Sequence, residues 1–150
     1  MRLHHIGYLV KSLDRSIAAF RALDYEPVLL CEASESAEYM YDEYRQCDIC
    51  FLRQPAAAQT EPTAYVELIA PKSEASPIWG LMRTYKNSPY HLCFESDDLE
   101  ADIQHLRGAG WMIFQPEAPA PAIHDLSVVF LVHRSAGIIE LININANKVV

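Results

Sequence analysis

Two stretches of similar sequence open the two halves of this chain: His5-Ile-Gly-Tyr-Leu-Val-Lys-Ser-Leu-Asp-Arg-Ser-Ile-Ala-Ala-Phe20 and His91-Leu-Cys-Phe-Glu-Ser-Asp-Asp-Leu-Glu-Ala-Asp-Ile-Gln-His-Leu106. When His91 is placed on His5, the apolar residues that follow in the two stretches coincide. Each stretch begins with the alternation of a strand and continues with apolar residues at helical spacing. The chain therefore contains two copies of one structural unit, which begins with a strand and a helix.

Each copy also closes on a similar segment, Tyr65-Val-Glu-Leu-Ile69 in the first and Ile138-Ile-Glu-Leu-Ile142 in the second. Each half thus supplies one histidine and one glutamate from strand-like segments. Imidazole and carboxylate together form a ligand set for a divalent transition metal. We therefore predict a metal site built from four side chains, two from each half: His5, Glu67, His91 and Glu140.

Side-chain alternation places these four residues on one face of their strands. Val66 and Leu68 share one face of their strand while Glu67 points the other way, and Glu140, His5 and His91 lie opposite the aliphatic residues of their own strands. Each strand can then pack one face on a helix and turn the other to a concave surface. Two buried carboxylates without a cation would repel each other, which favours a metal site over a structural role for these residues.

The other histidines fit this set less well. His4 lies on the opposite face of its strand from His5, although a register shift of one residue would exchange the two. We expect His105 on the exposed face of the second helix and His133 in a loop. His124 falls in a proline-rich segment, where it is a candidate for substrate contact.

The spacing of Cys47 and Cys50 resembles a redox or metal-binding Cys-x-x-Cys motif, but the segment Cys47–Leu52 is strand-like. Residues three apart on a strand point to opposite faces. We therefore expect buried thiols, not a dithiol pair.

The chain has 150 residues, 51% of them apolar and 21% charged, which is typical of a soluble globular protein, and we expect a single domain over residues 1–150. A membrane-spanning helix is not expected, because no run of about 18 apolar residues occurs. A secretory signal is not recognised either, so the expected location is the cytoplasm. The net charge of −8 and the lack of a basic stripe argue against a nucleic-acid partner.

The expected secondary structure repeats the order β-α-β-β-β. Strands are predicted at Leu3–Val10, Val28–Cys31, Asp48–Arg53, Ala64–Ala70, Tyr90–Glu95, Trp111–Phe114, Ser127–Val132 and Gly137–Asn143. Ser12 is the expected N-cap of a first helix, whose apolar residues extend as far as Leu23. Asp97 is the expected N-cap of a second helix, where Glu100 would complete a capping box. The acidic, tyrosine-rich segment 33–45 suggests an edge strand or hairpin, and residues 78–85 a short helix. The proline-rich segment 116–125 is expected to be an irregular flap.

The sequence resembles the vicinal oxygen chelate superfamily, which includes glyoxalase I, methylmalonyl-CoA epimerase, extradiol dioxygenases and the bleomycin- and fosfomycin-resistance proteins. The resemblance covers residues 3–143 and is most specific in the two opening stretches and in Val129-Phe-Leu through Gly137-Ile-Ile-Glu-Leu-Ile142. It is closest to the methylmalonyl-CoA epimerase branch. It implies an α+β fold of two βαβββ modules, at 1–70 and 90–143 with a connector at 71–89, that form a cupped, incomplete mixed-sheet barrel.

The resemblance implies one divalent ion (Zn, Ni, Co, Mn or Fe) bound by His5, Glu67, His91 and Glu140, and a homodimer. It also implies a metal-dependent isomerase, epimerase or lyase that acts on a small carbonyl, thioester or hemithioacetal substrate through an enolate, with Glu67 and Glu140 as both ligands and bases. Epimerases of this family have a catalytic glutamate where Tyr44 aligns, so the adjacent Glu43 is the candidate second base. They commonly have an amide ligand at the position of Glu67, where a glutamate is closer to glyoxalase I.

Two other functions fit the same fold. One is a non-catalytic protein that binds a small molecule such as an antibiotic, but such proteins typically lack the four ligands. The other is an iron dioxygenase, whose site uses two histidines and one carboxylate with three open positions. A fourth ligand at Glu67 would occupy one of those positions.

Overall fold

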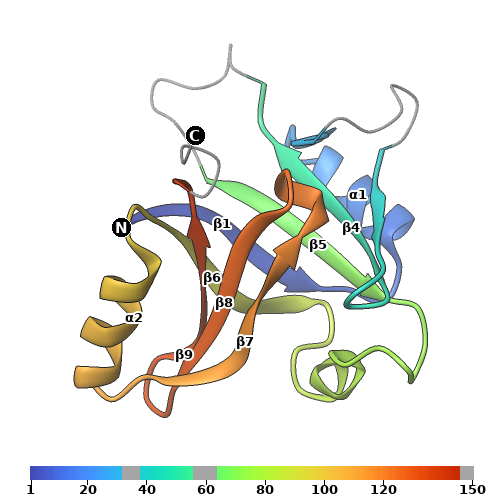
Figure 1. The fold of residues 1–150 in the computed structure, drawn as a ribbon. Coiled ribbons are helices and arrows are strands. Elements are labelled where there is room, and N and C mark those ends of the chain that lie inside the picture. The colour runs from blue at the N-terminus through green and yellow to red at the C-terminus, as the bar shows by residue number, and fades with distance from the viewer. Residues whose placement is uncertain (32–37, 56–63, 146–150) are drawn as a thin grey trace.

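Figure 1 shows the computed structural model, which describes residues 1–31, 38–55 and 64–145. The first module contains β1 (Arg2–Leu9), α1 (Leu13–Arg21), β2 (Glu26–Val28), β3 (Met40–Asp42), β4 (Cys47–Arg53) and β5 (Tyr65–Pro71). A connector with the short 3-10 helix η2 (Trp79–Arg83) follows. The second module contains β6 (Ser88–Ser96), α2 (Leu99–Gly108), β7 (Met112–Ala120), the 3-10 helix η3 (Pro121–Ile123), β8 (Leu126–His133) and β9 (Gly137–Asn143).

All these strands belong to one mixed sheet, in the order β2-β4-β5-β1-β6-β9-β8-β7, with β3 beside β4. The first and last strands of each module are parallel neighbours: β1 pairs with β5, and β6 with β9. The antiparallel pair β1–β6 joins the modules. Among the described residues β2 and β7 do not pair with each other, so the sheet curves into an open cup (Figure 1). The cupped α+β fold of two similar modules is confirmed.

Apolar residues form a core on each face of the sheet. Leu13 and Ile17 of α1 pack against Cys50, Leu52 and other residues of β4 and β5 on the outer face of the first module. Leu99 of α2 packs in the same way against β8 and β9. A third cluster, which includes Leu9, Cys47, Phe51, Tyr90, Phe130 and Ile142, fills the concave side. The alternation in the sequence therefore predicted the two faces correctly.

The outer face is not covered by a helix everywhere. Phe94 of β6 packs on the α2 side as expected, but Leu92 is 41% exposed. Leu92 pairs with Ile6 of β1, at the junction of the two modules. The expectation that Leu92 can pack on a helix is therefore wrong: the apolar cluster under α2 includes Phe94 of β6 but not Leu92.

Cys47 and Cys50 point to opposite faces, as the strand alternation predicted. Cys47 lies in the cluster on the concave side and Cys50 in the cluster under α1, and both thiols are free. Burial raises the pKa of Cys50 to about 12, so this thiol stays protonated at neutral pH. Within the described ranges, no helix combines the length and the apolar character needed to cross a membrane.

The proline-rich segment differs from the prediction of an irregular flap. Residues 112–120 form the continuous strand β7, which contains Pro116 and Pro119, and only η3 and the residues after it are irregular. Proline cannot donate a backbone hydrogen bond, but an edge strand tolerates it because one side of the strand lacks a partner. β7 is such an edge strand, and its register with β8 shifts between Gln115 and Ala118.

The opposite edge of the sheet also differs in detail. The predicted strand at residues 28–31 lies at Glu26–Val28 instead, and Pro27 is again in an edge strand. β2 and β3 pair with successive parts of β4, so together they occupy the position that β7 alone has in the second module. Part of the predicted hairpin at 33–45 falls outside the described residues, and the described part contains β3.

The starts of the two helices test the capping predictions. Ser12 is the N-cap of α1 and its hydroxyl accepts a hydrogen bond from the backbone N–H of Arg15. α1 ends at Arg21, so Leu23 lies beyond the helix and is exposed. α2 is capped by Asp98 and not by Asp97, because β6 continues to Ser96 and the helix begins one residue later than expected.

We predict that Asp98→Ala lowers the free energy of unfolding by about 1 kcal/mol, because the Asp98 carboxylate accepts a hydrogen bond from the backbone N–H of Ala101 at 3.0 Å. Asp97→Ala is the matched control and should change stability by less than about 0.5 kcal/mol, as exposed substitutions usually do. Urea denaturation measures both. Equal losses in the two variants would contradict the assignment of the cap.

Candidate metal centre

The structure brings the four predicted ligands together on the concave side of the sheet. His5 lies on β1, Glu67 on β5, His91 on β6 and Glu140 on β9, which are the four central strands. All four are buried, with exposed fractions of 1%, 7%, 3% and 5% in that order. One nitrogen or oxygen from each side chain lies within 4.8 Å of the other three. The strand alternation and the parallel pairing within each module explain this convergence.

The distances within the cluster are short. His5 Nε2 lies 3.0 Å from His91 Nε2. The same nitrogen lies 3.1 Å from Glu67 Oε2 and 3.1 Å from Glu140 Oε2. His91 Nε2 lies 3.5 Å from Glu67 Oε2 and 3.3 Å from Glu140 Oε2. Ligands at about 2.1 Å around one ion are separated by about 3.0 to 3.4 Å at adjacent positions. The five distances from the two imidazole nitrogens, 3.0 to 3.5 Å, are close to this spacing.

Hydrogen bonding alone explains this arrangement poorly. His5 Nε2 faces another imidazole nitrogen and two carboxylate oxygens, but it can carry only one hydrogen. Glu140 Oε2 has no hydrogen-bond partner of acceptable geometry in the described part of the chain. Two imidazoles and two carboxylates are a donor set that suits a divalent transition metal. The residues present therefore fit a divalent cation.

The charges of the cluster shift the pKa values of its members. Burial lowers the pKa of His5, but Glu67 and Glu140 more than offset this effect and raise the pKa to about 9. Burial raises the pKa of Glu140, yet the close contacts and charges of His5 and His91 hold it well below its ordinary value. In the metal-free protein a proton on His5 therefore compensates part of the carboxylate charge at neutral pH.

His4 contacts the cluster from outside, which the sequence did not predict. Its Nδ1 lies 2.8 Å from Nδ1 of His5. Burial and the proximity of His5 lower the pKa of His4 to about 4, so His4 is neutral and can accept a hydrogen bond from His5. A proton held on Nδ1 of His5 leaves Nε2 free to face the centre of the cluster.

His4, His5 and Cys93 form a second group of candidate ligands. Burial raises the pKa of Cys93 well above its ordinary value, so its thiol stays protonated and is a poor ligand.

A small cavity of about 20 Å³ lies beside the cluster. This volume has room for one water molecule or one ion. Its walls include residues of β4, β5, β6, β8 and the turn after β3, together with the end of β7 and η3. The lining residues are His5, Asp42, Arg45, Ile49, Glu67, Ile69, Tyr90, Ala120, Ala122, Ile123, Phe130 and Glu140.

Glu43 and Tyr44 do not line this cavity but are exposed in the turn between β3 and β4. The assignment of Glu43 as a second base stays a prediction. The structure instead buries the flanking residues Asp42 and Arg45, which sequence reasoning missed. Their spacing of three residues in a turn was the available signal, since it allows an ion pair, but it does not reveal burial.

The remaining histidines lie outside the cavity. His105 is exposed on α2, as expected. His124 is exposed at the end of η3, directly after Ile123 of the cavity wall. Its contact with a substrate stays a prediction. The expectation that His133 lies in a loop is wrong: it is the last residue of β8, and its ring lies at 5.3 Å from the ring of Trp111.

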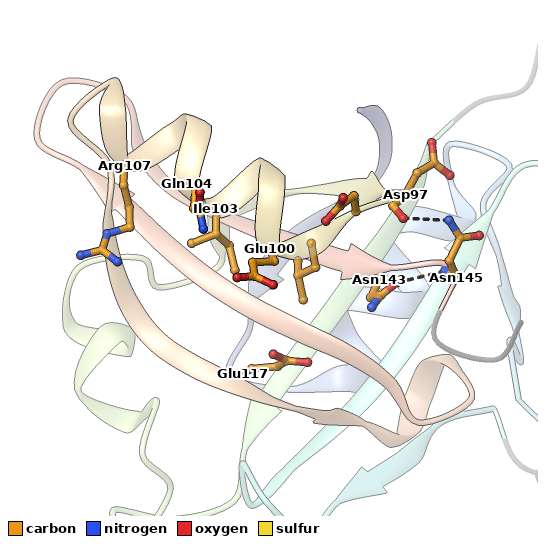
Figure 2. Close-up of a pocket in the computed structure, with 10 residues that line it drawn as sticks. Asp97, Glu100, Ile103, Gln104, Arg107, Glu117, Asn143 and Asn145 are labelled. Atoms are coloured by element: carbon orange, nitrogen blue, oxygen red, sulfur yellow. Dashed lines mark hydrogen bonds between the residues drawn. The ribbon is translucent and has the colours of Figure 1, made fainter. Parts of the chain in front are cut away.

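A larger groove of about 620 Å³ lies elsewhere, between α2 and the edge of the second module (Figure 2). Four of its ten lining residues are acidic: Asp97, Asp98, Glu100 and Glu117. None of the four clustered residues lines it. In this protein the larger groove is therefore not the one beside the four clustered residues.

We predict that Gly7→Ala prevents metal binding. Gly7 faces His91 across the β1–β6 pair, and a Cβ atom at this position would lie 2.0 Å from His91 Cε1. The imidazole would have to move, and overpacking of this kind destabilises a fold by about 1–3 kcal/mol. Gly80→Ala is the matched control, because a Cβ there meets nothing within 4 Å. Elemental analysis and urea denaturation measure both effects; full metal occupancy in Gly7→Ala would contradict the site.

We also predict that the apparent affinity for a divalent metal rises about tenfold per pH unit from about pH 7 to 9 and then levels off. The pKa of His5 is raised to about 9, so metal must displace a proton below that pH and none above it. Competition with a chelator of known pH dependence measures the affinity. An affinity that is constant over this range would show that His5 is not a ligand.

Comparison with known proteins places the chain in a family. A family model described as the Glyoxalase/Bleomycin resistance protein/Dioxygenase superfamily matches residues 4–130. The ethylmalonyl-CoA/methylmalonyl-CoA epimerase of Cereibacter sphaeroides is 32% identical over 73 residues, which are 48% of this chain and 54% of the relative. The chain therefore matches about half the length of that curated relative.

Solved structures show the same fold. The methylmalonyl-CoA epimerase from Mycobacterium tuberculosis superposes with a TM-score of 0.70 at 20% identity, covering 95% of this chain and 87% of that one. A methylmalonyl-CoA epimerase in complex with methylmalonyl-CoA and NH4+ gives a TM-score of 0.72 at 21% identity, covering 97% and 95%. Because the family model spans most of the sequence, this chain belongs to the glyoxalase/bleomycin resistance protein/dioxygenase superfamily.

Proposed function

We propose that this protein is a metal-dependent epimerase that inverts a carbon centre next to the carbonyl group of a small substrate. The observation that carries the proposal is the convergence of four buried donor atoms, from His5, Glu67, His91 and Glu140, within 4.8 Å. The epimerase relatives support the reaction class.

The chain's own residues supply the binding site and the base. A divalent cation at the cluster supplies a Lewis acid, which stabilises negative charge that develops on a carbonyl oxygen. Glu140 is ionised at neutral pH because its pKa is held well below the ordinary value. It can therefore accept the proton from the carbon next to the carbonyl. We assign the return of a proton to Glu67, the other carboxylate of the cavity.

The substrate class follows from the relatives and stays part of the proposal. The Cereibacter sphaeroides relative is named for ethylmalonyl-CoA and methylmalonyl-CoA, and one similar structure contains methylmalonyl-CoA. We propose an acyl thioester or a related small carbonyl compound for this chain. The cavity of about 20 Å³ is too small for such a molecule. The wall formed by Ala120, Ala122 and Ile123 at η3 would therefore move when substrate binds.

A glyoxalase-type lyase is the second candidate. The carboxylate of Glu67 favours it, because the sequence resembles glyoxalase I at this position, where epimerases commonly have an amide. Both candidates pass through removal of a proton from carbon, so the same exchange experiment detects either. A protein that only binds a small molecule would show no exchange.

We predict that protein stripped of metal and reloaded with Zn, Ni, Co, Mn or Fe(II) holds about one ion per chain and exchanges the C2 proton of methylmalonyl-CoA in deuterated water. His91→Ala should lose the ion, because it removes one of four donor side chains. Glu140→Gln should lower the exchange rate by at least about 100-fold, since an amide cannot act as a base. Mass spectrometry follows the deuterium, and elemental analysis follows the metal.

The exposed residue Glu74 provides the control Glu74→Gln, which should keep both metal and exchange. Glu43→Gln tests the second base that the resemblance implies. Loss of exchange with metal retained in that variant would assign the role to Glu43. One tightly held ion with no exchange of methylmalonyl-CoA, hemithioacetals or α-oxo acids would contradict an enolate-forming enzyme.

A further inference from the structure

The cavity beside the cluster contains a cation that the proposed metal site does not use. Arg45 lies in the turn between β3 and β4 and lines the same cavity as His5, Glu67 and Glu140. It is only 4% exposed. A guanidinium group is rarely buried to this extent without a full set of partners.

Four hydrogen bonds hold Arg45 in place. Its Nη1 donates a hydrogen bond to Asp42 Oδ2 at 2.7 Å and a longer one to the carbonyl oxygen of Pro119 at 3.4 Å. Its backbone N–H donates to Asp42 Oδ1 at 2.9 Å, and the hydroxyl of Ser76 donates to its backbone carbonyl at 2.6 Å. Asp42 itself is fully buried. The guanidinium is therefore fixed at one of its two terminal nitrogens.

The other terminal nitrogen, Nη2, has no hydrogen-bond partner within residues 1–31, 38–55 and 64–145. Among the residues that the structure describes, Nη2 of Arg45 is one of four buried side-chain atoms without a hydrogen bond. An unsatisfied donor of this kind costs about 1–3 kcal/mol, and more when the group is charged. A fixed guanidinium with one free terminal nitrogen is a suitable partner for a carboxylate oxygen.

The chemistry of the cavity wall favours an anionic ligand at this nitrogen. Apart from the four polar side chains His5, Asp42, Glu67 and Glu140, the described lining residues beside Arg45 are apolar or aromatic. Arg45 is the one lysine or arginine among them. The ring of Phe130 lies 5.8 Å from the guanidinium carbon. A ligand that enters this cavity meets the His5, Glu67 and Glu140 cluster, the Asp42–Arg45 ion pair with its unpaired Nη2, and otherwise apolar or aromatic walls.

We propose that Nη2 of Arg45 binds a carboxylate of the substrate and thereby selects acids over neutral carbonyl compounds. This inference rests on the proposed function in one respect: it places the ligand of Arg45 in the cavity where the proposed substrate binds. The competing explanation is structural: Arg45 neutralises Asp42, and a water molecule satisfies Nη2. The two explanations differ in what a substitution does to ligand selectivity.

The test compares two probes that differ in one charge. Monomethyl malonate has one carboxylate and one ester carbonyl, and dimethyl malonate has two ester carbonyls. Isothermal titration calorimetry with the full chain, both zinc-loaded and metal-free, gives the ratio of their dissociation constants. The wild-type protein should prefer the acid by about tenfold or more, as a charge-assisted hydrogen bond implies. The metal-free arm separates this preference from binding of the carboxylate to zinc.

Arg45→Lys is the first variant, because a lysine can still pair with Asp42 but has no second nitrogen to donate. The double variant Asp42→Asn/Arg45→Gln replaces the ion pair by two amides and avoids leaving Asp42 buried and unpaired. In both variants the acid preference should fall at least about fivefold while the zinc content stays at about one per chain. Circular dichroism checks that each variant is folded.

Arg53→Lys is the matched control. Arg53 also has a buried nitrogen without a partner and lies over an aromatic ring, but it does not line this cavity. It should keep the wild-type preference. No acid preference in the wild-type protein, or an unchanged preference in Arg45→Lys, would overturn the proposal. An acid preference that depends on Arg45 in a protein without metal binding or exchange would support this inference and contradict the proposed function.

Discussion

The repulsion between two buried carboxylates, Glu67 and Glu140, is the constraint on which the centre of this structure depends. Removing their charges from water costs several kcal/mol unless a positive partner is close. The two imidazoles supply that partner in the form of a proton on His5, whose pKa is raised to about 9. A divalent cation satisfies the same demand with more charge and with a fixed geometry. The proton and the cation thus compete for one position in the fold.

The close approach of the strands serves this arrangement. β1 and β6 lie side by side, and Gly7 has no side chain where the ring of His91 lies. His4 reaches the outer nitrogen of His5. These supporting contacts fix the direction in which each imidazole points, which is what a metal site requires of the residues around its ligands.

The order of strands and helices and the four clustered residues were predictable because both depend on short-range periodicity, whereas the cupped sheet was implied by the family resemblance. A strand alternates every two residues, so the aliphatic residues around Glu67 and Glu140 indicate where each carboxylate points. Features that depend on tertiary contacts were not predictable. The sequence Asp42-Glu-Tyr-Arg45 does not reveal that its ends are buried, because the burial depends on contacts with Ser76 and Pro119. The extension of β7 through Pro116 likewise depends on its place at the sheet edge.

The division of the cluster between the modules has a mechanical consequence. His5 and Glu67 come from one module, and His91 and Glu140 from the other, with 86 positions between the two histidines. A cation held by all four acts as a cross-link that closes a long loop, and such links restrict the unfolded chain more strongly as the loop lengthens. The modules are then tied to unfold together.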